Sequence, residues 1–180
     1  MARSRALGGK LDIKRYFVEE LKREYGERIA SAGRAESTTA EEASRLQSGS
    51  SRREDGKTAA MEGRLASGHR RRRKQAVAEM EALLDFAERG MPVYRPKDRV
   101  GVGALVDVQI EDETGEEERT LFLLPVGSGA ELTGPGGDGF VVVVAPKSPV
   151  GKALMGARVG DSFEIVVDGR DREWTVLDLC

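Results

Sequence analysis

The sequence predicts an α+β protein, in which an antiparallel α-helical coiled-coil hairpin over residues 1–92 precedes a small β-rich domain over residues 93–180. The first observation is that apolar residues recur at every third or fourth position in two stretches, from Leu11 to about Ala32 and from Met61 to Ala87. The second is that short β-branched runs, separated by Gly, Pro and Asp, follow Pro92. The third is charge, because the first part holds 20 Lys and Arg against 15 Asp and Glu, and the second holds 9 against 16. Net charges of +5 and −7 indicate two separate contact surfaces.

Two amphipathic helices account for the first part. The first is predicted from Leu11 to about Ala32, and its apolar face consists of Ile13, Phe17, Leu21, Tyr25 and Ile29. The second is predicted over residues 51–89 and ends at Gly90 and Pro92, with an apolar face formed by Met61, Leu65, Ala76, Val77, Met80, Leu83, Leu84 and Ala87. Both faces are too narrow for a globular core, so we expect the helices to pack antiparallel on each other.

Residues 33–56 are rich in Ala, Ser, Gly and charge and can bury little apolar surface. We expect a poorly packed helix end here and a turn near Gln47–Ser50. Two capping-box patterns, at positions 38–41 and 51–54, each suit the start of a helix.

Five strands and one short helix are predicted in the second part. The strands are Leu105–Ile110, Thr120–Leu124, Phe140–Ala145, Ser162–Val167 and Trp174–Leu179. Residues 113–115 and 168–170 are typical of hairpin turns. The helix follows the third strand, with Ser148 as its N-cap, Pro149 in its first turn and Gly156 at its exit.

Composition excludes several classes of protein. No apolar stretch approaches the roughly 20 residues that cross a bilayer. The start of the chain lacks the apolar run of a signal peptide, so a cytoplasmic location and no membrane partner are expected. The single cysteine, Cys180, cannot form an intramolecular disulfide or a thiolate metal cluster. We expect a monomer that binds no cofactor by itself.

Residues 148–161 have the sequence SPVGKALMGARVGD, which resembles the signature of the C-terminal domain of bacterial Gre-type transcription elongation factors. In that signature Ser-Pro, a small residue, a basic residue, Ala-Leu, Gly and Gly-Asp follow one another in this order. Residues 102–106 and 173–177 are similar to the first and last strands of that domain, and residues 61–66 to the Glu-Gly-Arg stretch of the family's second helix. The resemblance implies an FKBP-like fold for the β-rich domain.

The resemblance also implies a function. Such factors seat the C-terminal domain at the rim of the secondary channel of RNA polymerase and extend the helical hairpin into that channel. The chain would then be an accessory protein and not an enzyme, with RNA polymerase as partner and RNA or DNA of the transcription complex within reach. Ser148, Pro149 and Lys152 are the docking residues that it implies.

At the hairpin tip of that family, carboxylates help to hold a second Mg²⁺ in the polymerase active site, where backtracked RNA is hydrolysed. Hard divalent ions require such oxygen ligands. The corresponding residues here are Ser51, Arg52, Arg53, Glu54 and Asp55, so Glu54 and Asp55 are the candidate catalytic and metal-binding residues. The family's aspartate is replaced by Ser51, and two arginines lie beside it, so we predict weak or absent cleavage stimulation. Helix capping by both acids is the alternative interpretation.

The run from His69 to Lys74 contains Arg70, Arg71, Arg72 and Arg73, which are candidates for contact with nucleic acid or polymerase. The alternative is a solvated basic band. Two other functions stay open, an FKBP-like peptidyl-prolyl isomerase and a basic coiled-coil adaptor for nucleic acid. The isomerase is disfavoured because most aromatic residues of the β-rich domain occupy alternating strand positions that suggest a core.

Overall fold

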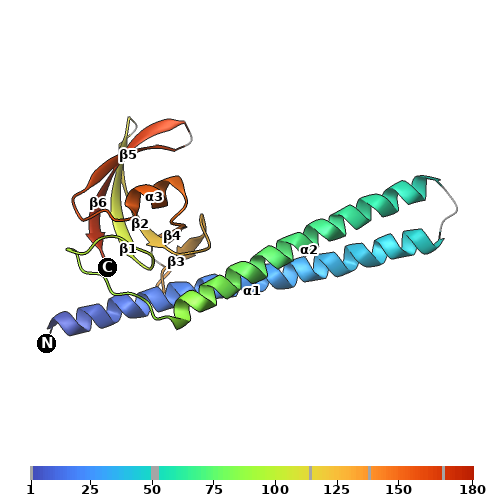
Figure 1. Cartoon of the computed structure of the whole chain (residues 1–180), viewed down its shortest axis with the longest axis horizontal. Helices are drawn as coiled ribbons and strands as arrows, with labels where there is room; N and C mark the ends of the chain where they lie inside the picture. Colours follow the sequence, from blue (N-terminus) through green and yellow to red (C-terminus); the bar gives the residue numbers. More distant parts are fainter. Residues whose placement is uncertain (1, 50–52, 114, 138, 168) are drawn as a thin grey trace. The chain divides into compact units, whose positions relative to one another are not determined.

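The computed structural model describes residues 2–49, 53–113, 115–137, 139–167 and 169–180. Two long helices precede a mixed β-sheet and one short helix, which confirms the predicted fold class (Figure 1). The chain forms two compact units, one made of residues 1–21 and 82–180 and the other of residues 22–81. The first helix therefore contributes to both units, whereas the predicted domain division at residue 92 stays a prediction.

Helix α1 (Ala2–Gly49) is longer than its apolar pattern predicts. Residues 47–49 are helical, so the prediction of a turn near Gln47–Ser50 is wrong at these three positions, and Ser50 lies outside the described residues. The capping box predicted at position 38 is also wrong, because Thr38 lies inside the helix and its hydroxyl donates to the carbonyl oxygen of Arg34 at 3.1 Å. Thr39 donates to Ala35 in the same way, at 2.8 Å. Threonine can satisfy its hydroxyl on the preceding turn, so it does not have to start a helix.

Helix α2 (Arg53–Glu88) ends where the sequence predicts. Gly90 has a φ of 87° and donates its amide to the carbonyl of Ala87, a conformation that favours glycine after a helix. The buried line along α2 differs from the predicted one, because Met61 is 63% exposed and Leu65 42%, whereas Ala66, Ala76 and Leu83 are buried. Alanines bring the helices close together in unit 22–81, and the larger neighbouring side chains are left outside the seam.

The sheet has six strands in the order β3-β4-β2-β1-β6-β5. Five correspond to the predicted strands: β1 (Leu105–Asp112), β2 (Gly115–Leu123), β4 (Phe140–Val144), β5 (Ser162–Val167) and β6 (Arg170–Leu179). The prediction missed β3 (Glu131–Thr133), which is too short to show an alternating pattern. Strands β2 and β4 pair in parallel, and the other neighbours pair antiparallel.

One face of the sheet carries the main hydrophobic core. Helix α3 (Pro149–Leu154) contributes its buried Leu154 to a cluster with residues from β1, β2, β4, β5 and β6. The cluster includes Val106, Val108, Ile110, Leu121, Leu123, Val144, Ile165, Trp174, Val176 and Leu179. Burial of this apolar surface stabilises the unit and fixes the position of α3.

The opposite face of the sheet packs against the first part of α1, within the same unit. The rings of Phe17 and Phe122 lie 6.3 Å apart, and both side chains are buried. Lys14, which is 2% exposed, donates to the carbonyl of Pro92 at 3.0 Å. Residues 1–21 therefore belong structurally to the β-rich unit, although their spacing shows only one amphipathic helix.

Candidate functional site

The segment around α3 is locally rigid. The Ser148 hydroxyl accepts a hydrogen bond from the Gly151 amide at 3.0 Å and donates one to the Ala145 carbonyl at 2.8 Å. Pro149 occupies the first turn, as predicted. The Ser-Pro pair thus supplies both the N-cap and a pre-set backbone dihedral for a helix of only six residues. The side chain of Ser148 is engaged in this cap.

Gly151 is required by the packing of α3. A Cβ at this position would collide with the carbonyl oxygen of Ala145. At the other end of the segment, Gly156 donates its amide to Val100 at 2.9 Å, and Val100 donates to Ala157 at 2.8 Å. These contacts hold the exposed side of α3 in one orientation.

The exposed side of this segment forms a small mixed surface, which we call the α3 patch: Pro149, Lys152, Met155 and Val159. Pro149 and Lys152 are three residues apart on the helix and lie on one face. Met155 and Val159 are 41% and 37% exposed. Fixed backbone, one cation and exposed apolar side chains suit a docking surface for another protein.

The four candidate arginines of α2 are all exposed, but they do not have equivalent surroundings. Arg70 donates to Glu36 of α1 at 2.8 Å, and Arg73 lies 3.5 Å from the other oxygen of the same carboxylate. The hydrogen bond from Arg70 is the main cause that lowers the pKa of Glu36 below its ordinary value. Arg70 and Arg73 therefore join the two helices within unit 22–81.

Arg72 lies on another side of α2, where it lines a surface cleft of about 570 Å³ with His69. Residues of α1 form the other wall, among them Glu24, Glu27 and Arg28. Arg28 lies 3.9 Å from Glu79 and stacks 5.3 Å from the ring centre of Tyr25. No ion pair of Arg71 or Arg72 is found in the part of the chain that the structure describes. These two are the arginines that the helix pairing leaves available to a partner.

The hairpin tip is described only in part. Ser51 and Arg52 lie outside the described residues, and the helix begins at Arg53. Glu54 and Asp55 are successive residues in the first turn of α2, and their side chains lie outside the description. Successive residues of an α-helix project about 100° apart, so a single metal ion would be reached by one of them more readily than by both.

The role of Glu36 was not predicted from the sequence. A turn at residues 47–50 would place the arginines opposite Glu24 and Glu27, whereas the longer α1 places Arg70 and Arg73 against Glu36. The spacing of Arg70 and Arg73, one turn of helix apart, could have indicated a shared carboxylate.

Among residues with described side chains, no group of three His, Cys, Asp or Glu could hold a metal ion. No helix among those described is long and apolar enough to cross a membrane.

Residues 95–179 match the family model described as "Transcription elongation factor, GreA/GreB, C-term". Residues 95–179 are thus similar to the C-terminal domain of this family, and the predicted resemblance to Gre-type elongation factors is confirmed.

Curated relatives carry the same family name. The transcription elongation factor GreA of Streptococcus gordonii is 40% identical over 65 residues, which cover 36% of this chain and 34% of the relative. The GreA of Clostridium botulinum is 37% identical over 84 residues, covering 47% and 46%. The chain thus spans a third to just under half of the length of these relatives. Among solved structures, GreA factor homolog 1 of Thermus thermophilus is 18% identical, covers 88% of this chain and 94% of that chain, and has a TM-score of 0.34.

Proposed function

We propose that this chain is a regulator of transcription elongation that binds RNA polymerase and acts through its secondary channel. The match of residues 95–179 to the GreA/GreB C-terminal domain is the observation that carries the proposal. In this role the chain is an accessory protein of the cytoplasm, and the chemistry belongs to the polymerase. The β-rich domain docks at the channel rim, and the helical hairpin extends toward the active site.

The α3 patch supplies the docking contact in this proposal. Pro149 and Lys152 are exposed on a segment whose backbone is fixed by the Ser148 cap. Reversal of the Lys152 charge repels an acidic partner without removing any hydrogen bond that holds α3 in place.

The test measures binding of the full chain to purified RNA polymerase. The double variant Pro149→Ala, Lys152→Glu is expected to bind at least about tenfold more weakly, and its circular dichroism should equal that of the wild type. The matched control is Arg170→Glu, which makes the same charge change at an exposed position of β6. Equal loss in both variants, or no loss in either, contradicts docking through the α3 patch.

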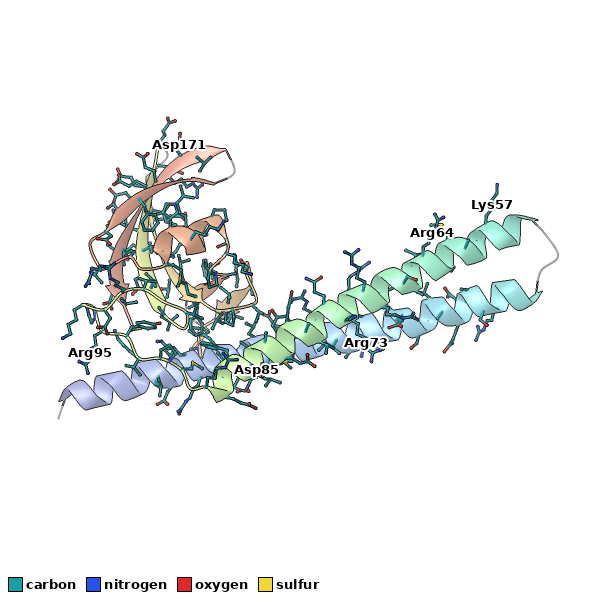
Figure 2. All side chains as sticks on the ribbon, viewed as in Figure 1. Lys57, Arg64, Arg73, Asp85, Arg95 and Asp171 are labelled. Carbon is teal, nitrogen blue, oxygen red and sulfur yellow. The ribbon has the colours of Figure 1, made fainter. Side chains whose placement is uncertain are left out.

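The arginines of α2 provide a second contact. Arg71 and Arg72 are free to meet phosphate groups or polymerase, whereas Arg70 and Arg73 are engaged with Glu36. Figure 2 shows further cations, Lys57 and Arg64, pointing away from α1 along the outer side of α2. An exposed row of cations attracts RNA, DNA or acidic protein surfaces by long-range electrostatics.

Glu54 and Asp55 are the carboxylates available near the tip for a Mg²⁺ ion shared with the polymerase. Their oxygen atoms suit this hard cation, which when bound would polarise a phosphoryl group and activate water. The adjacent arginines repel the ion, and two successive helical residues, which project about 100° apart, hold one ion less readily than two acids on the same face. We therefore expect weak or absent cleavage stimulation.

A transcript-cleavage assay on backtracked polymerase complexes tests the role of the tip. Any activity of the wild type should be abolished by Glu54→Ala and by Asp55→Ala without release from polymerase, because docking rests on the α3 patch. If both acids only cap the helix, each substitution lowers stability by about 1 kcal/mol and leaves transcription unchanged. Strong cleavage that survives both substitutions would rule out this assignment.

The prolyl isomerase alternative finds less support in the side chains. Phe122 is fully buried and Trp174 is 6% exposed, so neither can line an open proline pocket. Phe140 is 52% exposed on β4, so it does not belong to an enclosed pocket. Co-purification with RNA polymerase separates the proposed function from this alternative and from a nucleic-acid adaptor.

A further inference from the structure

Strand β5 has a free outer edge. It is the last strand in the order of the sheet, and among the described residues it pairs with β6 alone. Val167 and Arg170, which are separated by two residues in the sequence, lie opposite each other at the end of this hairpin. In such a hairpin the pair that flanks the connection exchanges both backbone hydrogen bonds, and every second pair after it does the same. The backbone groups of Phe163, Ile165 and Val167 therefore point to β6. Those of Ser162, Glu164 and Val166 point outward.

The outward-facing positions are exposed. No backbone hydrogen bond outside the strand pairs reaches Glu164 or Val166 in the described part of the chain. The side chains of Ser162, Glu164 and Val166 are all exposed, and Val166 reaches 63%. Natural sheets protect such edges with Pro, Lys, bulges or a covering element. β5 has neither Pro nor Lys, so its edge can accept another strand.

A row of four glutamates leads to this edge. Glu164 lies opposite Glu173, Glu173 opposite Glu111, and Glu111 opposite Glu116, across β5, β6, β1 and β2. Residues directly opposite one another share a face of the sheet, and all four are exposed. Like charges in direct cross-strand pairs cost stability. Figure 2 shows Asp171, a further acid, near the hairpin end of β6.

The row of glutamates determines the charge of the strand that the outer edge of β5 would accept. In an added strand, the residue opposite Glu164 would occupy the next position in line with the four glutamates. A Lys or Arg at that position is attracted by Glu164 and by the carboxylates behind it. A second copy of this chain would instead bring another row of glutamates to the same edge, which disfavours self-association.

We propose that the outer edge of β5 binds an extended basic segment of a partner protein by strand addition. The segment places Lys or Arg opposite Glu164 and an apolar residue beside the exposed Val166. Backbone hydrogen bonds to Ser162, Glu164 and Val166 hold it in register. This edge is distinct from the α3 patch, which lies with the hydrophobic core on the other face of the sheet, so the two proposals fail independently.

The test uses the full chain and a disulfide-closed β-hairpin peptide whose free strand carries Lys and Val two positions apart with Thr between them, so that Lys lies opposite Glu164 while Val lies beside Val166. The closed hairpin is already extended, so little conformational entropy is lost on binding. A peptide with Glu in place of Lys is the matched probe. Titration calorimetry should show binding of the Lys peptide that weakens with added salt, and binding of the Glu peptide at least about tenfold weaker. The amides of Glu164 and Val166 should become protected from hydrogen exchange.

Two substitutions of Val166 separate the contribution of the backbone amide from that of the side chain. Val166→Pro removes an outward amide and leaves the bonds to β6 intact, whereas Val166→Thr keeps the amide and the β-branched shape. We expect at least about tenfold weaker binding for the proline variant, as one lost hydrogen bond and a steric block predict, and little change for threonine. Glu164→Lys should reverse the preference between the two peptides, and it tests the proposal even if the proline variant fails to fold.

Three outcomes would overturn the proposal. The first is absence of binding by the Lys peptide, and the second is equal binding of both peptides or of the folded Val166→Pro variant. The third is concentration-dependent self-association in analytical ultracentrifugation that Val166→Pro abolishes, because it assigns the edge to a second copy.

Discussion

Lys14 is a charged side chain in a buried position. It is 2% exposed, donates to the carbonyl of Pro92 and lies 5.3 Å from the ring centre of Tyr94. Burial lowers the pKa of Lys14 from its ordinary value of 10.5 to about 8. The burial of Lys14 could not be predicted from the sequence, because Lys14 follows the apolar residue Ile13 and stands among other charged residues. Its burial follows from the packing of residues 1–21 on the β-rich unit.

The lowered pKa of Lys14 predicts a rise of stability with pH. Between pH 8 and 10.5 the unfolded chain keeps the proton that the folded chain has lost, so the free energy of unfolding increases with pH. The increase is up to about 3 kcal/mol over this range. Urea unfolding of the wild type and of Lys14→Met at several pH values checks it. The difference between the two proteins isolates Lys14 from other titrating groups, and parallel pH profiles would contradict the prediction.

At the scale of the helices, Glu36 joins α1 to α2 where both carry small side chains. Its carboxylate meets Arg70 and Arg73, and Gly33 leaves room for the Arg73 side chain at 3.8 Å from an added Cβ. Apolar packing is thin in this region, since the buried residues near it are alanines such as Ala43 and Ala66. Ion pairs therefore contribute a larger part of the stability of this helix pairing than they would if leucines packed between the two helices.

This arrangement predicts that the four arginines divide into two pairs. Arg70→Gln with Arg73→Gln should increase amide exchange around residue 36, because Glu36 loses both partners. Arg71→Gln with Arg72→Gln should leave exchange unchanged and reduce the salt dependence of the proposed polymerase binding, by roughly one unit of slope for each phosphate contact that this proposal assigns to them. Lowering the pH through the depressed pKa of Glu36 should imitate the first pair. Identical behaviour of both pairs would contradict the division.

The elements were predicted where a local signal exists. Ser148, Pro149 and Gly156 bound α3 in the sequence because capping is local, and Gly90 ends α2 for the same reason. The full length of α1 was not predicted, because its segment after residue 32 is rich in alanine and serine. Such a segment can form a helix but has no periodic pattern of apolar residues that would reveal it. The pairing of Glu36 depends on that extent. The β5 edge and the glutamate row depend on strand order and register, which a single sequence does not specify.

At the scale of the whole molecule, the first helix has two roles along its length. Residues 1–21 belong with the β-rich unit, and the following residues pair with α2 in the other unit. Phe17 and Phe122 are 3% and 0% exposed, and Leu21 lies against the backbone at Gly127, where an added Cβ would come within 2.9 Å of it. The sheet face around Phe122 is thus covered by a segment that precedes it by about a hundred residues.

This packing predicts that the β-rich unit loses stability when residues 1–21 lose their contacts. Phe17→Ala should lower the free energy of unfolding by about 3 kcal/mol, because a buried ring is replaced by a cavity. The fragment 93–180 should also unfold at a lower urea concentration than the same unit in the full chain, since Phe122 becomes exposed. Trp174, the only tryptophan and 6% exposed, reports the transition by fluorescence.

The matched control is Phe140→Ala, which removes the same ring from a position that is 52% exposed and should cost less than about 1 kcal/mol. An unchanged urea midpoint in Phe17→Ala, or equal losses in both variants, would show that residues 1–21 do not stabilise the sheet. In that case division near residue 92 would describe the folding units better than the grouping of residues 1–21 with 82–180. A larger loss in Phe17→Ala places the start of the first helix inside the folding unit of the domain that we propose to dock, so removal of residues 1–21 would weaken the proposed polymerase binding through stability alone.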